Sequence, residues 1–96
     1  MKFTTDANIN GTCLQGYVQV YYHELVEIFG KDEGGGDKTT AEWRLLFEDG
    51  VVATIYDWKE YDTPTGNYAW HIGGKNNLAV ARVTQVIREF KEKNAK

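Results

Sequence analysis

The sequence has little of several residue types on which common activities depend. Its 96 residues include one cysteine, one proline and no serine. A single thiol excludes an internal disulfide framework and a cysteine-rich zinc site, and the absence of serine excludes a serine nucleophile. No apolar run approaches the roughly 20 residues that a membrane span needs, and residues 1–11 lack the apolar region of a secretory signal. We therefore expect a cytoplasmic protein with no membrane partner.

Positive charge is also scarce over most of the chain. Residues 1–70 hold five Lys and Arg against twelve Asp and Glu, a net charge of −7, whereas residues 71–96 hold six against two, a net charge of +4. An acidic body disfavours contact with phosphates, so we expect no direct sequence-specific binding of nucleic acid. Aromatic residues make up 14% of the chain, which suggests that some of them lie at a binding surface.

The first half of the chain predicts a strand, a short helix and a glycine-rich loop. Residues 12–21 follow a tight-turn pair, Asn10-Gly11, and alternate with the period of a strand. Residues 22–29 change to helical spacing, and residues 31–40 contain three consecutive glycines. The apolar face of the predicted strand would carry Leu14, Gly16, Val18 and Val20.

A hairpin is predicted at the centre of the chain. Asp49-Gly50 between two apolar runs is typical of a two-residue turn, which pairs Phe47 with Val52 and Trp43 with Tyr56. One face would then be large and apolar and would pack under helices. This expected core face consists of Trp43, Leu45, Phe47, Val52, Thr54, Tyr56 and Trp58. The other face would expose an apolar strip for a partner or a homodimer, made of Leu46, Ala53 and Ile55.

A short strand at residues 70–72 and a long helix complete the predicted fold. Asn76 or Asn77 would cap this helix, which extends to about Asn94. The elements together predict a single α+β domain over residues 1–96. It would contain an antiparallel β-sheet built around the Asp-Gly hairpin, with the short helix and the long C-terminal helix packed on one face.

Residues with catalytic or metal-binding potential are isolated in the sequence. His23 has Glu27 one helical turn away, which falls short of the three or four ligands of a zinc site. Cys13 has no predicted helix N-terminus or histidine beside it to activate its thiol. We therefore expect no catalytic residue, no metal and no cofactor, and a protein that is not an enzyme.

One segment has features of an anion-binding site. Gly73-Gly74 leads into a predicted helix N-terminus, where backbone N–H groups and the charge of Lys75 would attract a phosphate or carboxylate. The segment departs from a P-loop, because one glycine is missing and Asn76 stands where Ser or Thr would be. A tight turn followed by a helix cap explains the same residues, so both interpretations stay open.

Acidic loop residues and surplus tyrosines predict a surface that binds another protein. Exposed tyrosines are common anchors of protein interfaces. Stacking on single-stranded nucleic acid would need interleaved Lys and Arg, which residues 17–21 lack. The candidate partner-binding residues are Asp32, Glu33, Asp37, Asp57, Glu60, Asp62, Tyr17, Tyr21, Tyr61 and Tyr68.

Several segments resemble a group of small proteins encoded by bacteriophages. These segments include LQGYV at residues 14–18, YHELVEIFG at 22–30, ATIYDWK at 53–59 and WHIGGK at 70–75, and the similarity extends over about residues 14–85. The group supplies no catalytic residues to carry over. The resemblance implies a protein of the host-cell cytoplasm, and small acidic phage proteins include inhibitors of host machinery such as anti-CRISPR proteins.

Three functional interpretations remain, and the first is favoured. In the first, a non-enzymatic inhibitor uses acidic loops and tyrosines to cover a host defence or nucleic-acid-processing protein, such as a CRISPR effector or a nuclease. In the second, the protein sequesters a nucleotide or phosphate through Gly73, Gly74 and Lys75. In the third, a virion accessory protein associates with itself through the strip that contains Leu46.

Overall fold

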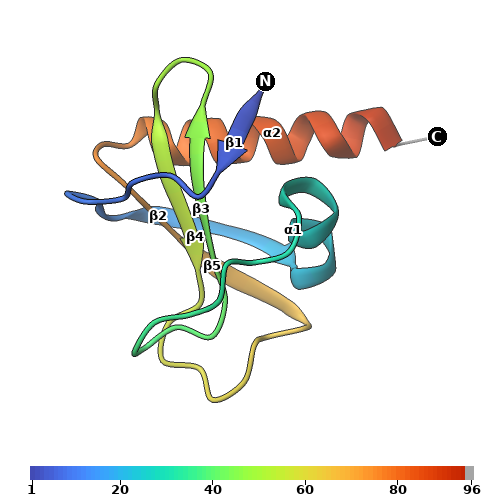
Figure 1. Cartoon of the computed structure of the whole chain (residues 1–96). Helices are drawn as coiled ribbons and strands as arrows, with labels where there is room; N and C mark the ends of the chain where they lie inside the picture. Colours follow the sequence, from blue (N-terminus) through green and yellow to red (C-terminus); the bar gives the residue numbers. More distant parts are fainter. Residues whose placement is uncertain (95–96) are drawn as a thin grey trace.

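The computed structural model describes residues 1–94 and confirms the α+β fold. Its elements in chain order are β1 (Phe3–Thr5), β2 (Cys13–Tyr21), α1 (Tyr22–Phe29), β3 (Glu42–Phe47), β4 (Val52–Tyr56), β5 (Asn67–Gly74) and α2 (Leu78–Asn94). All strand pairs are antiparallel, and the order across the sheet is β1-β3-β4-β5-β2. Figure 1 shows α2 lying along the sheet and α1 beside one end of it.

The core lies between the two helices and one face of the sheet, called here the covered face. Trp43 and Trp70 are fully buried there, with ring centroids 5.6 Å apart. Burial of aromatic and branched side chains on this scale is the main favourable term for a small domain. The helices contribute Leu25, Phe29, Ala79, Val83, Val86 and Ile87 to the core.

Both helices form where the sequence predicts them. The backbone N–H of Tyr21 donates to Glu24 Oε1 at 3.1 Å and so closes the start of α1. At the start of α2, the backbone N–H of Leu78 donates to Asn76 Oδ1 at 2.9 Å, which identifies Asn76 as the capping side chain. Within residues 1–94, neither helix has the length and apolar character to cross a membrane.

The hairpin register is one residue away from the prediction. The backbone N–H of Phe47 donates to Val51 O at 2.9 Å, and Gly50 has a φ of 86°. The turn is therefore a three-residue loop that ends in a left-handed glycine, not a two-residue turn. As a result Trp43 pairs with Ile55 instead of Tyr56. A shift of one residue moves every side chain of β4 to the other face of the sheet.

This register overturns the predicted self-association strip. Ala53 and Ile55 are fully buried in the core, and Leu46 is the one exposed member of the three. Tyr56 and Trp58, which the prediction placed in the core, lie on the opposite face instead. The predicted core face was correct for its β3 residues and wrong for its β4 residues.

A bulge in β2 corrects a second prediction. The register of β2 against β5 shifts between Leu14 and Gly16, so Leu14 pairs with Gly73 and leaves the covered face. Leu14 is 46% exposed, on the same face as Tyr17. Gly16 stays on the covered face, where a Cβ would come within 2.9 Å of Val80 Cγ2. A side chain there would therefore collide with α2.

Candidate functional site

The face of the sheet opposite the helices, called here the open face, carries an aromatic hollow of about 360 Å³. Cross-strand pairing brings its central side chains together, because Tyr17 of β2 and Tyr56 of β4 both pair with His71 of β5. The hollow is lined by Leu14, Tyr17, Tyr56, Trp58 and His71.

The aromatic rings of the hollow contact one another. The ring of His71 lies 4.8 Å from that of Tyr17 in an edge-on arrangement and 5.3 Å from that of Tyr56. Tyr56 in turn lies 6.3 Å from Trp58, also edge-on. These centroid distances are in the range of favourable aromatic pairs. The rings of the hollow are thus held by one another.

His71 is in an unusually dry environment for an open sheet face. Its Nδ1 atom is buried and has no hydrogen-bond partner among the described residues. Burial lowers the pKa of His71 below its usual value of 6.5, and the carboxylates of Asp57 and Glu60 offset part of this effect. Burial likewise raises the pKa of Tyr56, with Tyr17 adding to the shift. Both shifts favour the neutral form of the side chain.

Two long loops connect α1 to β3 (residues 30–41) and β4 to β5 (residues 57–66). Asp57 joins these two loops and is not an exposed acid. It is fully buried, and its Oδ1 accepts hydrogen bonds from the backbone N–H of Thr40 at 2.7 Å and of Ala41 at 3.1 Å. Its Oδ2 accepts from the Thr40 hydroxyl, which also contacts the hydroxyl of Thr63 at 2.7 Å. The prediction that Asp57 binds a partner is wrong, because its lone pairs are engaged inside the protein.

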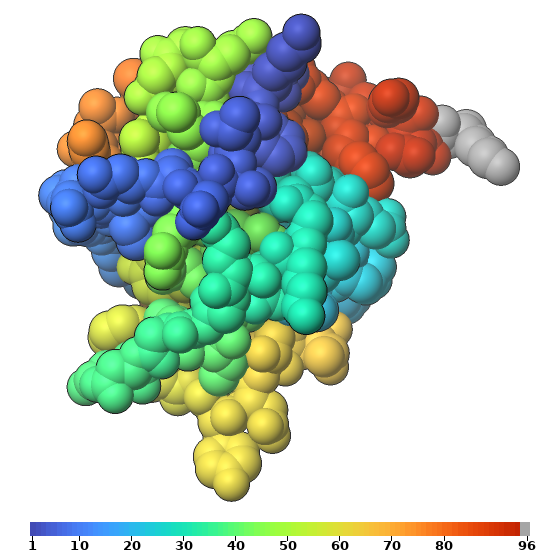
Figure 2. Space-filling view, in the orientation of Figure 1, coloured from blue at the N-terminus to red at the C-terminus, as the bar shows by residue number. Residues whose placement is uncertain are grey.

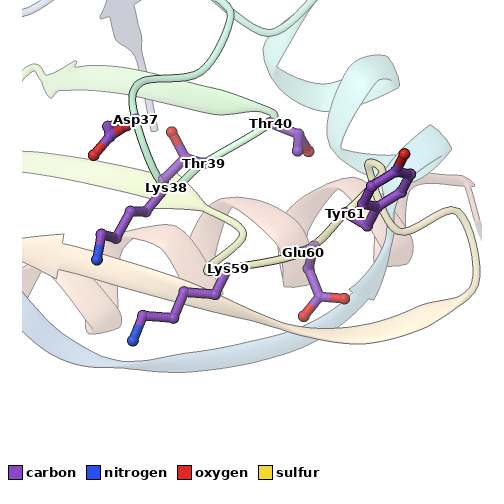
Figure 3. A pocket seen from close by; sticks show the side chains of 7 residues that line it. All are labelled: Asp37, Lys38, Thr39, Thr40, Lys59, Glu60 and Tyr61. Carbon is purple, nitrogen blue, oxygen red and sulfur yellow. The ribbon is translucent and has the colours of Figure 1, made fainter.

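The two loops project from the same end of the molecule and form a second hollow between them (Figure 2). The backbone N–H of Lys59 donates to Lys38 O at 2.8 Å and holds the loops together. This hollow has a volume of about 530 Å³ and is lined by Asp37, Lys38, Thr39, Thr40, Lys59, Glu60 and Tyr61. Figure 3 shows that the side chains of Lys38 and Lys59 extend in the same direction. The loop end therefore carries both signs of charge.

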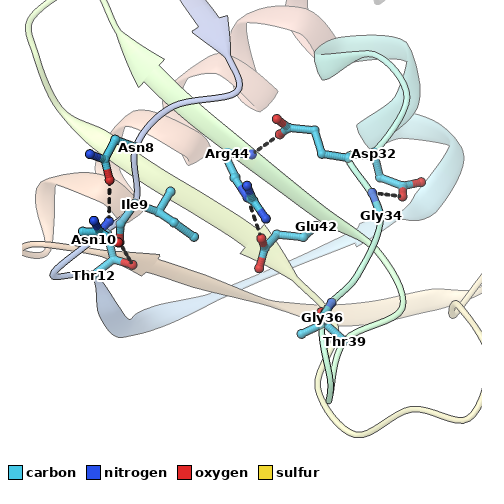
Figure 4. Close-up of polar contacts among 11 residues, drawn as sticks. Asn8, Ile9, Asn10, Thr12, Asp32, Gly34, Gly36, Thr39, Glu42 and Arg44 are labelled. Atoms are coloured by element: carbon cyan, nitrogen blue, oxygen red, sulfur yellow. Dashed lines mark hydrogen bonds and ion pairs between the residues drawn. The ribbon is translucent and has the colours of Figure 1, made fainter.

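Two of the predicted acids are engaged with the protein itself (Figure 4). Asp32 accepts hydrogen bonds from the Tyr22 hydroxyl at 2.7 Å and from the backbone of Gly34 at 3.0 Å. Glu33 Oε2 accepts from the backbone N–H of Arg44 at 2.6 Å. The Asp32 contacts are made with α1 and with its own loop, the Glu33 contact is made with β3, and neither acid lines the aromatic hollow. Of the predicted acids, Asp37 and Glu60 line the loop hollow, and Asp62 is exposed close by.

The predicted tyrosines divide into exposed and structural ones. Tyr17, Tyr21 and Tyr61 are exposed, and Tyr61 reaches 97% exposure at the tip of its loop. Tyr68 packs edge-on against Trp70 at 5.2 Å, and its hydroxyl accepts a hydrogen bond from the backbone N–H of Trp58. Tyr68 thus supports the position of Trp58 beside the hollow and is itself half-buried.

The glycine pair forms part of the sheet and does not form an open anion site. Gly73 and Gly74 are buried residues of β5, which has a strand on each side. A Cβ on Gly74 would lie 2.3 Å from the Cβ of Ala79, so this glycine allows α2 to approach the sheet. Lys75 is exposed beyond the end of the strand. The structure therefore favours the turn-and-cap interpretation of this segment.

Sequence reasoning missed Tyr56, Trp58 and His71 as parts of the site. The first two were assigned to the core because of the hairpin register, and His71 was predicted only as part of a short strand. The signal that points to them is Gly50, which also fits a three-residue loop with its last residue in the left-handed region. Within residues 1–94, no group of three or more His, Cys, Asp or Glu could hold a metal ion.

Comparisons with known proteins found no matching family model, no matching curated protein and no matching solved structure.

Proposed function

We propose that the protein is a non-enzymatic binding protein that inhibits a host defence or nucleic-acid-processing protein by covering its working surface. The observation that carries the proposal is the aromatic hollow on the open face. Tyr and Trp side chains in such a position bury a large area at little cost in side-chain entropy and often dominate the energy of an interface. The resemblance of the sequence to bacteriophage proteins supports this class of partner.

The acids of the loop end are the groups that would face a basic groove on the partner. Asp37, Glu60 and Asp62 lie there, and Glu60 and Asp62 follow Trp58 by two and four residues. Lys38 and Lys59 lie beside these acids, so the charge of the loop end is mixed. Proteins that process nucleic acids carry basic grooves, and charge complementarity mainly raises the association rate. We therefore expect the affinity to depend on the aromatic hollow and the association rate to depend on the loop acids.

A pair of variants tests this division of roles. The wild type is used to capture proteins from a bacterial lysate, and a captured nuclease or CRISPR effector is then assayed for inhibition of cleavage. The variant Tyr17→Ala/Trp58→Ala should bind that enzyme at least about 30-fold more weakly, which corresponds to the loss of one interface hot spot. The variant Asp37→Lys/Glu60→Lys should mainly slow association, and this slowing should shrink as salt concentration rises.

Glu92→Lys is the matched control, because Glu92 is exposed on α2 far along the chain from both loops. This variant should bind and inhibit like the wild type. The proposal fails if the captured enzyme still cleaves at its normal rate, or if the aromatic variant retains full affinity while its circular dichroism spectrum stays native. It also fails if no such enzyme is captured.

A further inference from the structure

The sheet has an unprotected edge at β2. Within residues 1–94, β2 pairs with β5 alone, so its other side presents unpaired backbone groups. Its sequence, CLQGYVQVY, contains no charged residue and no proline. Natural proteins usually protect such an edge with charges, proline, a β-bulge or a very short strand. The bulge of β2 lies between Leu14 and Gly16 and leaves residues 17–21 as a regular edge. Tyr17, Gln19 and Tyr21 are exposed along it. This edge is therefore suited to pairing with another strand.

We propose that β2 pairs in the antiparallel direction with β2 of a second copy of this chain, across a two-fold axis at Gln19. In this register Gln19 lies opposite Gln19 of the second copy. Tyr17 lies opposite Tyr21 of the second copy on the open face, and Val18 lies opposite Val20 of the second copy on the covered face. Every residue in the pairing then faces one of similar chemistry.

The geometry of β2 selects this register. A two-fold axis perpendicular to a continuous sheet keeps both open faces on the same side only when a residue stands opposite itself at the axis. The bulge between Leu14 and Gly16 restricts regular pairing to the residues that follow it, and α1 begins at Tyr22. An axis at Gln19 uses residues 17–21 of both copies. An axis at Val18 would bring Tyr21 opposite the bulge.

A second copy fits this edge better than a charged or irregular segment would. The regular part of β2 is neutral, so two copies meet without charge repulsion, and aromatic residues directly opposite each other stabilise antiparallel strands. The pairing also extends the site described above, because Tyr21 of the second copy would stand beside Tyr17 at the wall of the aromatic hollow. The dimer does not depend on the proposed host partner, and it would form in the purified protein.

Charge substitutions at the axis test the dimer directly. Gln19→Lys and Gln19→Glu each place two like charges opposite one another, so each variant alone should dissociate at least about tenfold more readily than the wild type. An equimolar mixture of the two variants should recover a heterodimer, which sedimentation velocity measures. The matched control is Thr4→Lys, which adds a charge to an exposed residue of β1 at the opposite edge of the sheet and should leave the dimer intact.

Cysteine cross-linking tests the register independently. In a Cys13→Ala background, Gln19→Cys should form an intermolecular disulfide on oxidation, because directly opposed residues lie within the required Cα separation. Tyr17→Cys in the same background should not, since its counterpart lies four residues away along the second copy. The proposal is overturned if the wild type sediments as a monomer at its highest soluble concentration, if mixing the charge variants restores no dimer, or if Tyr17→Cys cross-links as readily as Gln19→Cys.

Discussion

The same strands supply buried core residues to the covered face and residues of the aromatic hollow to the open face. In β5, Trp70 and Ile72 are fully buried under the helices, whereas His71, between them, lines the hollow on the open face. In β4, Ile55 is buried in the core and Tyr56 contacts His71. Alternation along β5 therefore places His71 between two core residues, and alternation along β4 places Tyr56 next to the core residue Ile55.

Two tryptophans show how differently the two faces contribute to the stability of the fold. Trp70 is fully buried and packs against Trp43 and Tyr68, whereas Trp58 is 43% exposed beside Tyr56. The covered face supplies the stability of the fold, and the open face leaves a large apolar ring in contact with water. Trp58 lies together with the exposed Leu14 and Tyr17, so the open face carries several large apolar side chains in one place.

The largest expected effect comes from removing one of these two rings. Trp70→Ala should lower the free energy of unfolding by about 3–5 kcal/mol, because it opens a cavity in the core. Trp58→Ala should lower it by less than about 1 kcal/mol, since surface substitutions usually have small effects. Urea unfolding followed by circular dichroism measures both. Equal losses from the two variants would show that the open face is also part of the stabilising core.

The adjacent glycines Gly73 and Gly74 of β5 allow the two faces to be compared by smaller expected losses of stability. A Cβ on Gly74 meets Ala79 of α2 at 2.3 Å, whereas a Cβ on Gly73 meets the Thr54 hydroxyl at 2.5 Å on the open face. Gly74→Ala should cost about 1–3 kcal/mol because the helix must move. Gly73→Ala should cost less, about 1 kcal/mol, because the nearest atom ends a single side chain and does not belong to a packed helix. The same urea titrations separate the two values, and a larger loss from Gly73→Ala would contradict this account.

Much of the covered face could be predicted because its signals are local. The period of residues 42–47, the helical spacing of residues 22–29 and the capping Asn76 each act within a few neighbours. The register of β4 was not accessible in the same way, because Gly50 fits both a two-residue turn and a three-residue loop. Because of this one-residue shift, the prediction placed Ile55 on the exposed face and Tyr56 in the core, whereas the structure has the reverse. The prediction therefore assigned Tyr56 and Trp58 to the core and not to the site.

The burial of Asp57 could not be predicted from neighbouring residues, because its hydrogen-bond partners are distant in the sequence. Its hydrogen-bond donors, Thr40 and Ala41, lie 17 and 16 residues earlier in the chain. A carboxylate in a loop is normally solvated. No local sequence pattern predicts that the fold brings these backbone donors to Asp57. The predicted exposed acids Asp37 and Glu60 were placed correctly at the loop end, because loops of this composition lie at the surface.

The smallest expected effect concerns the pH dependence that His71 gives to the open face. Its folded-state pKa lies below 6.5, so the unfolded chain binds more protons between these two values. The free energy of unfolding should therefore fall as pH decreases from 6.5 through the folded-state pKa, and remain constant with respect to His71 above pH 6.5. Urea unfolding at several pH values should show this slope in the wild type and in His23→Asn, whose histidine is exposed. His71→Phe should remove it, and a slope unchanged in that variant would show that the ring of His71 is not in a dry environment.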